Sequence, residues 1–326
     1  MGSFADVLLS GPRGRRLCWW AAGGRLDPGA ADAVLHRDVE VSDPLVAFAE
    51  SVGCAMYWQE PDEVDLALAA PGAVRGLRPA AEAVAAASGT GWWFEPIGAD
   101  QRYVRWVDPV VPAPELTGAA DRLARWRAAT AEQEAACRAR EDALDAPISG
   151  TWWSTPDRTE LVTTTRPLPG FGAVGLVLEE DSLGVPEAIC HPLRPARERG
   201  VHEPSVHKPR VHEIRGAADW CALVERYPLE VTASRRHDWW RATGTDARWL
   251  IPDYAAVAAD HDAVHLTAAA YLEAAGRALP VGDAATVLAG WNPDETWWLT
   301  DVLGPAGAPE RWCEDEGDPV GWTRTS

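Results

Sequence analysis

Three histidines recur every five residues in the segment VHEPSVHKPRVHEI. They are His202, His207 and His212. Neutral imidazoles bind zinc well, so the run raises the question of a metal site. A spacing of five places successive side chains on opposite faces of an extended chain, and Pro204 and Pro209 favour that extended form. We therefore interpret the run as a proline-stiffened loop and expect no metal.

A second histidine pair lies in the segment AADHDAVHLT. His261 and His265 are four residues apart, with Asp260 and Asp262 on either side of His261. That spacing is typical of two metal ligands on one face of a helix. The apolar pattern, however, predicts that the helix ends before His265 and that His265 belongs to a strand. We therefore interpret the segment as a helix-to-strand junction.

The motifs of several enzyme classes are missing from the sequence. No GxxxxGK[ST], GxSxG or HExxH motif occurs, and Lys208 is the only lysine among 30 basic residues. A P-loop needs its lysine beside the phosphates, and a Schiff base needs a lysine amine. P-loop hydrolysis and Schiff-base chemistry are therefore not expected.

Tryptophan is the most unusual feature of the composition. Ten of the 18 tryptophans form five adjacent pairs, which are Trp19-Trp20, Trp92-Trp93, Trp152-Trp153, Trp239-Trp240 and Trp297-Trp298. Four of the pairs, all except the one at 239–240, fall in segments that we predict as strands, where neighbouring side chains point to opposite faces of a sheet. Two interpretations remain open. Both faces are packed, which aromatic strand residues favour, or one row of indoles lines a cleft and stacks on a nicotinamide, adenine, sugar ring or cation.

Charge restricts the partners. The chain of 326 residues has a formal net charge of −19, with acidic residues along nearly its whole length. Such a surface repels a nucleic-acid backbone, and we interpret the short basic runs Arg13–Arg16 and Arg194–Arg199 as solvated loops. We therefore expect no nucleic acid as partner, and the partner is expected to be a small-molecule nucleotide or a basic protein.

Cysteine usage and hydropathy indicate the compartment. The six cysteines are widely spread without a CxxC motif, and no signal peptide is visible. No apolar run approaches the about 18 residues that a membrane span requires. We expect a cytoplasmic protein without a membrane segment.

Hydrophobic periodicity and breaker residues predict a mixed α+β fold. The helices are predicted at 43–53, 78–89, 117–142, 216–227, 252–262 and 268–279. The strands are predicted at 15–24, 54–59, 148–155, 160–167, 172–181, 210–216, 263–267, 285–291 and 296–302, with a hairpin at 92–109 around Gly98-Ala99-Asp100. We expect two mixed α/β halves, each with a small, Trp-rich, mostly antiparallel sheet flanked by helices. The domains would be 1–145, which ends in the long helix, and 146–326.

Several runs of the second half resemble a known fold. They are GTWWSTP, VHEIRGAADWCALVERYPLEV, IPDYAAVAADHDAVHLT and LAGWNPDETWWL. Within residues 148–302 these runs resemble a group of high-GC bacterial proteins whose arrangement is similar to the ADP-ribosyltransferase fold. In that fold, a strand with Ser-Thr and a late glutamate frame a nicotinamide dinucleotide.

The resemblance implies a set of catalytic residues. Ser154 and Thr155 match the Ser-Thr strand that orders the site, and Glu295 matches the glutamate that orients the nicotinamide ribose. A carboxylate near the ribose hydroxyl stabilises the developing oxocarbenium ion. An equally good interpretation of Glu295 is a turn residue in Asn-Pro-Asp-Glu.

The resemblance also implies residues that hold the dinucleotide. Aromatic walls would exclude water from the site, and they would come from Trp152, Trp153, Trp297 and Trp298. The fold further expects an Arg or His on an earlier strand, and Arg16 is the only early candidate. If Arg16 takes that role, either both halves form one site or one of the halves is degenerate.

Two functions follow from these observations. The first is ADP-ribosyl transfer or NAD glycohydrolysis by the second half, with NAD as the substrate. The second is a non-catalytic, acidic, Trp-rich binding protein, either a partner that neutralises a basic toxin or a sensor of a small ligand. A carbohydrate-binding Trp platform is a third function, which the expected cytoplasmic location argues against.

Overall fold

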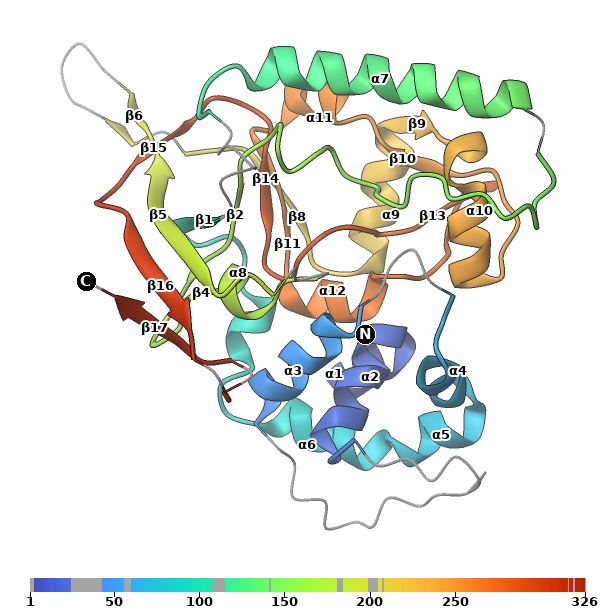
Figure 1. Cartoon of the computed structure of the whole chain (residues 1–326), viewed down its shortest axis with the longest axis horizontal. Coiled ribbons are helices and arrows are strands. Elements are labelled where there is room, and N and C mark those ends of the chain that lie inside the picture. The colour runs from blue at the N-terminus through green and yellow to red at the C-terminus, as the bar shows by residue number, and fades with distance from the viewer. Residues whose placement is uncertain are drawn as a thin grey trace.

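The computed structural model of the chain has a mixed α+β architecture of helices and several small sheets (Figure 1). Among its described helices, none has both the length and the apolar character that a membrane crossing needs. The structure describes residues 3–24, 43–55, 60–107, 115–140, 142–180, 184–198, 205–206, 208–315, 317–318 and 320–325.

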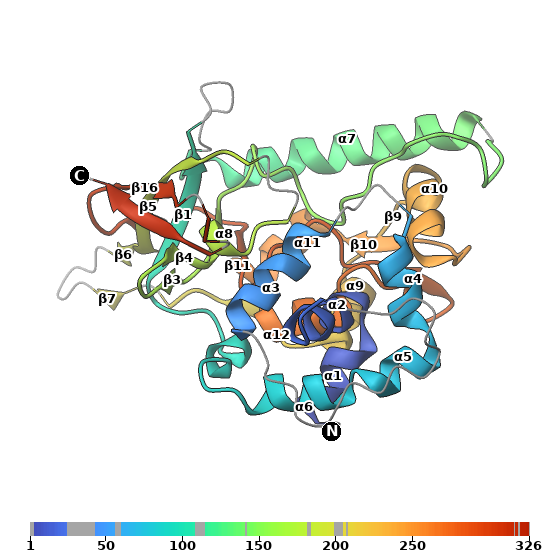
Figure 2. The ribbon, with the colours of Figure 1, turned by 60° about the horizontal axis from the view of Figure 1, so that its bottom comes forward.

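Short N-terminal helices form one layer, at the bottom of Figure 1 and in front in Figure 2. They are α1 (Phe4–Ser10), α2 (Pro12–Ala21), α3 (Pro44–Gly53), α4 (Glu63–Ala69), α5 (Pro71–Gly76) and α6 (Arg78–Ala86), followed by the 3₁₀ turn η1 (Gly91–Phe94). Sequence signals fix two of the helix starts. Ser3 and Asp6 form a capping box at α1, and the Asp43 side chain accepts from the amide of Leu45 at α3. The helices predicted at 43–53 and 78–89 are confirmed.

The predicted strand at 15–24 is wrong, because residues 15–21 lie in helix α2. Pro12 begins this helix, where its missing N–H costs nothing. The buried face includes Arg13, Leu17 and Ala21 at a spacing of four. Because Arg13 is charged, the buried face of this helix does not show up as a periodic pattern of apolar residues. The adjacent residues Trp19 and Trp20 therefore suggested a strand. The basic run Arg13–Arg16 is therefore part of a helix with buried arginines and not a solvated loop.

The largest sheet joins the first third of the chain to its end. Its strand order is β1-β5-β16-β17, and β15 also pairs with β5. The strands are β1 (Gln101–Trp106), β5 (Glu187–Pro195), β15 (Leu303–Pro305), β16 (Glu310–Glu314) and β17 (Trp322–Thr325). Strand β1 therefore pairs with β5, with Val104 opposite Cys190, and not with a strand of its own half. The division at residue 145 stays a prediction.

A second sheet has the order β2-β14-β11-β8 and contains the only described parallel pair between named strands, β8 with β11. Its strands are β2 (Thr163–Thr164), β8 (Val211–Ile214), β11 (Ala263–Leu266) and β14 (Thr296–Trp298). One row across the sheet brings together Thr164, Thr296, His265 and Glu213. Because residues in one row share a face, this register places polar side chains side by side.

The remaining elements are short. The two-stranded sheets pair β3 (Pro167–Leu168) with β4 (Gly172–Ala173), β6 (Arg197–Glu198) with β7 (Ser205–Val206), β9 (Pro228–Glu230) with β10 (Leu250–Pro252), and β12 (Leu279–Val281) with β13 (Ala284–Thr286). The other helices are α7 (Ala119–Arg140), α8 (Val174–Val177), α9 (Ala217–Arg226), α10 (Thr232–Thr243), α11 (Tyr254–Asp260) and α12 (Ala268–Ala274). The helices predicted at 117–142, 216–227, 252–262 and 268–279 are confirmed as α7, α9, α11 and α12.

Three further strand predictions fail in the described residues. Residues 148–155 form no strand, and 172–181 hold only the two residues of β4 before helix α8. The predicted hairpin at 92–109 is instead η1 followed by the single strand β1. The strand predicted at 54–59 falls mostly outside the described residues.

Most tryptophan pairs lie outside strands, contrary to the prediction. Only Trp297 and Trp298 lie in a strand, β14, and there they do point to opposite faces, because they belong to different buried clusters. The other four pairs lie in α2, in η1, in the irregular segment at 152–153 and in α10.

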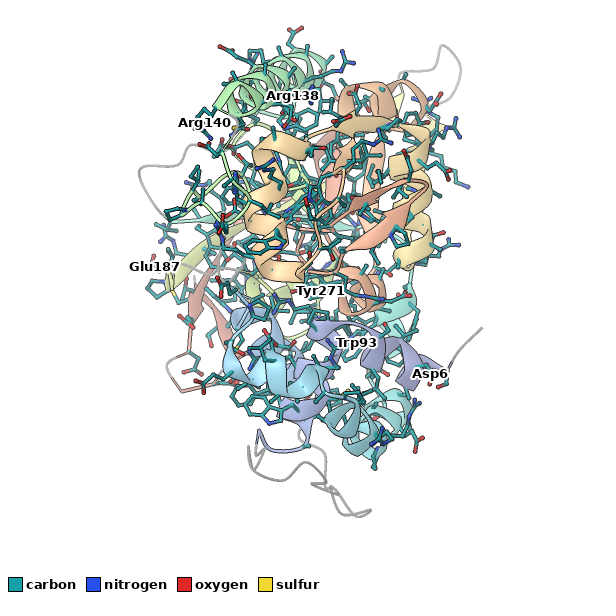
Figure 3. All side chains as sticks on the ribbon, turned by 90° about the vertical axis from the view of Figure 1, so that its right-hand side faces the viewer. Asp6, Trp93, Arg138, Arg140, Glu187 and Tyr271 are labelled. Atoms are coloured by element: carbon teal, nitrogen blue, oxygen red, sulfur yellow. The ribbon has the colours of Figure 1, made fainter. Side chains whose placement is uncertain are left out.

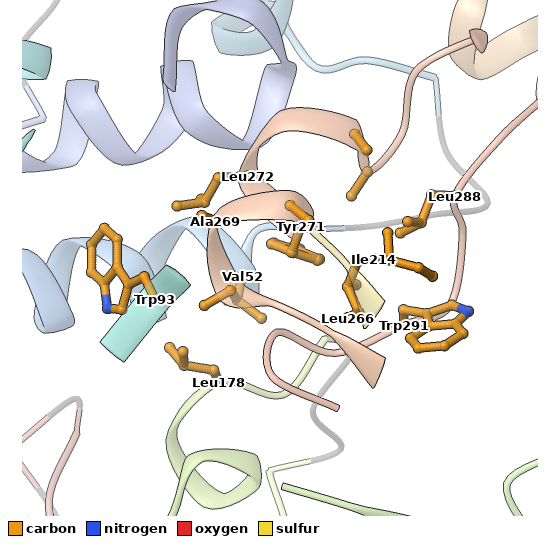
Figure 4. Close-up of a cluster of buried hydrophobic side chains, with 14 of the residues drawn as sticks. Val52, Trp93, Leu178, Ile214, Leu266, Ala269, Tyr271, Leu272, Leu288 and Trp291 are labelled. Atoms are coloured by element: carbon orange, nitrogen blue, oxygen red, sulfur yellow. The ribbon is translucent and has the colours of Figure 1, made fainter. Parts of the chain in front are cut away.

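Helix α12 is the centre of the main core, which contains residues from Ala5 to Trp322. This helix is buried on nearly every side, so it packs between the N-terminal layer and the sheets. Figure 4 shows Trp93 and Leu288 on opposite sides of Tyr271. Phe48 connects the layers, with its ring centroid 4.9 Å from that of Trp93 and 6.1 Å from that of Tyr271.

The long helix α7 is attached to the body by a buried carboxylate. Arg138 and Arg140 lie at the α7 end of the molecule, away from the core residues Trp93 and Tyr271 (Figure 3). Glu134, which is 6% exposed, accepts from the amides of Ala233 (2.8 Å) and Ser234 (2.9 Å) and from the Ser234 hydroxyl (2.8 Å). Helix α10 has no capping side chain of its own. Glu134 therefore caps its N-terminus from α7.

We expect Glu134→Ala to lower the free energy of unfolding by about 2–3 kcal/mol, because it leaves buried amides without an acceptor. Glu132→Ala on the same helix is the control, because Glu132 is exposed. Urea unfolding followed by circular dichroism measures both. Equal stability of the two variants would contradict the capping role.

Candidate functional site

A turn before β14 collects buried polar side chains from distant parts of the chain. It consists of Asn292, Pro293, Asp294 and Glu295, and is called the Asn-Pro-Asp-Glu turn below. Its polar residues Asn292, Asp294 and Glu295 are at most 3% exposed. Asp294 has φ 60°, the one positive value among described residues other than glycine. Asp tolerates this conformation better than most residues do.

The predicted Ser-Thr pair lies against the chain just before this turn. The Ser154 hydroxyl donates to the carbonyl of Ala289 (2.9 Å) and accepts from its amide (3.0 Å). The Thr155 hydroxyl donates to the carbonyl of Gly290 at 3.5 Å. Both residues are buried, and both hydroxyls are occupied by backbone groups. They hold residues 152–156 against 289–290.

Glu295 is buried beneath an arginine. Its carboxylate accepts from Arg158 Nη2 (3.0 Å) and from the amide of Asn292 (3.1 Å). Burial raises the pKa of Glu295, and the Arg158 guanidinium opposes that rise. The Arg158 side chain is 36% exposed and that of Glu295 is 3% exposed. Arg158 therefore stands between Glu295 and solvent.

Of the four predicted indole walls, only Trp153 is open to solvent, with 47% exposure. Trp152 and Trp298 are buried, and Trp297 is buried with the Arg158 guanidinium 6.0 Å from its ring centroid. The Trp153 ring lies directly on Gly290, where an added Cβ would come within 2.1 Å of it. The residues carried over from the ADP-ribosyltransferase fold thus lie around one segment, 289–295, but mostly inside packed layers.

Arg16 does not join this group. Its guanidinium pairs with Asp62 at 2.5 Å and with Asp65 at 3.2 Å, and its side chain is 3% exposed. These partners belong to α4 and its cap. Arg16 therefore ties together two helices of the N-terminal layer.

A glycine pattern typical of dinucleotide binding is also built into the core. Residues 170–175, GFGAVG, have the spacing GxGxxG. In a dinucleotide site these glycines join a strand to the helix of a parallel βαβ unit. Here they turn the antiparallel β3–β4 hairpin into the four-residue, buried helix α8. The pattern therefore does not mark a nucleotide site.

The Asn-Pro-Asp-Glu turn also contacts a buried histidine, His265, which the sequence did not predict as part of a site. His265 is 1% exposed; its Nδ1 lies 2.7 Å from Glu213 Oε2 and its Nε2 lies 3.4 Å from Asp294 Oδ1. Burial lowers the pKa of His265, but the hydrogen bonds to Asp294 and Glu213 outweigh it and raise the pKa above the ordinary 6.5. The position between two carboxylates therefore favours the charged form of the imidazole.

Arg166 extends this site towards the surface. It donates to Asp294 from Nε at 2.7 Å and to Glu95 from Nη1 at 2.7 Å, and its guanidinium lies 5.5 Å from the ring centroid of Trp92. It also donates to the carbonyls of Glu95 and Pro96. The chain of charges therefore fastens the segment before β1 to the Asn-Pro-Asp-Glu turn.

An open cleft lies elsewhere, between helix α3 and the large sheet. It has a volume of about 200 Å³, and carboxylates and indoles line it. The carboxylates are Glu50, Glu179 and Glu314, and the indoles are Trp106 and Trp322. We call this the Glu–Trp cleft.

The indoles of the Glu–Trp cleft are held in place. Trp106 Nε1 donates to Glu179 Oε1 at 2.9 Å, and the ring centroids of Trp106 and Trp322 are 5.6 Å apart at an interplanar angle of 57°. Within the described part of the chain, neither Glu50 nor Glu314 forms an ion pair. Glu50 and Glu314 therefore present negative charge, without an ion-pair partner among the described residues, beside aromatic faces.

The histidine run is only partly described. His202 and His207 lie outside the described residues, and His212 lies in β8 with its ring centroid 5.3 Å from that of His261. In the portion of the chain that the structure covers, no group of three His, Cys, Asp or Glu side chains is arranged to hold a metal ion.

No family of known proteins, no curated protein and no solved structure matches this chain. The resemblance to the ADP-ribosyltransferase fold stays a prediction.

The raised pKa of His265 predicts a dependence of stability on pH. Its charged form contributes stability that is fully present below about pH 6.5 and is lost as the pH rises through the raised pKa. The free energy of unfolding should therefore fall more steeply above neutral pH in the wild type than in His265→Gln. Urea unfolding of both proteins across this range measures the difference, and parallel curves would refute it.

Proposed function

We propose that the protein is a non-catalytic binding protein that takes a positively charged ligand in the Glu–Trp cleft. The observation that carries this proposal is the meeting of three carboxylates and two indoles around one cavity. A cation over an indole face gains about 0.5–2 kcal/mol, the larger value when it is desolvated. The carboxylates add attraction for the same charge.

The charge of the whole chain supports this function. A net charge of −19 surrounds the molecule with a negative potential, which raises the encounter rate of cations and repels anions. The hydrogen bond from Trp106 to Glu179 also fixes one wall before a ligand arrives. A wall fixed in advance lowers the entropy lost on binding.

A trilysine peptide should bind to the wild type in a titration calorimeter, with an affinity that falls as salt is raised. The double variant Glu50→Gln/Glu314→Gln should bind about tenfold more weakly, because two carboxylates are lost. Glu82→Gln/Glu132→Gln removes the same charge at exposed positions outside the cleft and is the control. An equal loss in both double variants would show that only net charge matters, which contradicts a defined site.

ADP-ribosyl transfer is the second candidate function. It is favoured by the position of Ser154, Thr155 and Glu295 around one segment and by the exposed indole of Trp153. The described arrangement does not fit a nicotinamide riboside at Glu295, because Arg158 covers that carboxylate. The dinucleotide would have to displace Arg158, so we place this function second.

Release of nicotinamide from NAD separates the two functions. For a binding protein, we expect no release above the blank from the wild type or from Arg158→Ala, which uncovers Glu295. Chromatography of the reaction mixture measures the product. Release that is abolished in Glu295→Gln but kept in Glu82→Gln would establish the second function, provided that thermal unfolding shows both variants to be folded.

A further inference from the structure

We propose that the ligand of the Glu–Trp cleft is a linear aliphatic polyamine, whose ammonium groups are separated by methylene chains. This inference rests on the proposed function and names the class of cation. It rests on the carboxylates and the apolar side chains that line the same cavity.

The carboxylates come from three separate elements. Glu50 lies on α3, Glu179 follows α8, and Glu314 ends β16. In the described part of the chain, no three acidic, histidine or cysteine side chains come close enough together to hold one metal ion. The negative charge of the cleft therefore comes from side chains of different elements. A ligand with positive charges at separate points matches it better than one point charge does.

Apolar side chains line the cleft together with the carboxylates. Leu176 and Val177 are buried residues that line the cleft, and the rings of Trp106 and Trp322 line it as well. Such surface packs methylene groups but offers no acceptors for hydrogen bonds. An aliphatic chain between two ammonium groups matches both the carboxylates and the apolar side chains. Its charged ends can contact the carboxylates, and its methylene groups can pack on the apolar side chains.

A guanidinium group fits this arrangement less well. Its five N–H donors lie in one plane and favour bidentate binding, in which two N–H groups donate to the two oxygens of one carboxylate. Glu179 already accepts from the indole of Trp106, and the other two carboxylates stand on different elements. An ammonium group needs no such fork, because it acts as a compact charge with freely rotating donors.

The size of the cavity restricts the ligand. Its volume of about 200 Å³ is below the range of about 300–1,000 Å³ that is usual for sites of drug-sized ligands. A short diamine segment fits this size, and the rest of a longer polyamine would extend into solvent. The net charge of −19 also raises the association rate of such a multiply charged cation.

Calorimetry with amines of increasing charge tests the inference. Butylamine, putrescine and spermidine carry one, two and three ammonium groups on comparable chains. We expect putrescine to bind at least about tenfold more tightly than butylamine, which is a difference of about 1.4 kcal/mol, and spermidine to bind more tightly still. An equal concentration of Mg²⁺ should not displace putrescine, because Mg²⁺ requires a compact octahedron of oxygens.

Variants place the effect in the cleft. Glu50→Gln/Glu314→Gln should remove most of the advantage of putrescine over butylamine, whereas Glu82→Gln/Glu132→Gln should keep it. Trp106→Phe should weaken all three amines, because it removes the better cation-binding ring and the bond to Glu179. Because the Glu variants change partly exposed side chains, their folding is readily confirmed by thermal unfolding.

The outcomes separate this inference from the proposed function. Binding of trilysine without binding of the amines overturns the polyamine inference and leaves the proposed function in place. Equal affinity for butylamine and putrescine, or displacement of putrescine by Mg²⁺, also overturns the inference. If no cation binds at all, both the inference and the proposed function are wrong.

Discussion

The ion pair between the buried Asp294 and the partly exposed Arg166, with the imidazole of His265 beside it, is the interaction on which the arrangement of the layers depends. Charges inside a protein are tolerated only when each has a partner, because desolvation is costly. Here the partners come from the sheet, from the Asn-Pro-Asp-Glu turn and from the segment at 95–96. That segment leads directly into β1, and Trp106 at the end of β1 lines the Glu–Trp cleft. The charged interior thus sets the position of a wall of the open site.

The helices were the predictable part of the fold, because their signals are local. Asp43 and Pro44 mark the start of α3, and the apolar spacing in α9, α11 and α12 follows a helical period. The strands were predicted less well. Adjacent tryptophans suggested strands at 15–24 and 148–155, but Arg13 on the buried face of α2 and the backbone bonds of Ser154 depend on partners far away in the chain. At those positions, contacts with distant parts of the chain outweighed the intrinsic β-propensity of tryptophan.

The candidate sites were also predictable only where they depend on residues close together in the sequence, and not where they depend on contacts across the fold. The proximity of Ser154 and Glu295 to one segment was anticipated through the resemblance, but the cover by Arg158 is a contact across the fold that no spacing reveals. The pairing of His265 with Glu213 depends on the parallel register of β8 and β11. The Glu–Trp cleft was missed because its lining comes from α3, β1, the region of α8 and the C-terminal strands. The acidic and aromatic composition anticipated only its chemistry.

The pairing of β1 with β5 affects how the chain folds during synthesis on the ribosome. Residues 101–106 emerge well before 187–195, so the growing chain carries a strand whose hydrogen-bonding partner has not yet been made. Unpaired strands invite contact with other nascent chains. Arg102 and Arg105 interrupt this strand with positive charge, which discourages such contact until β5 arrives. The helices on the N-terminal side can form in the meantime, since their hydrogen bonds are local.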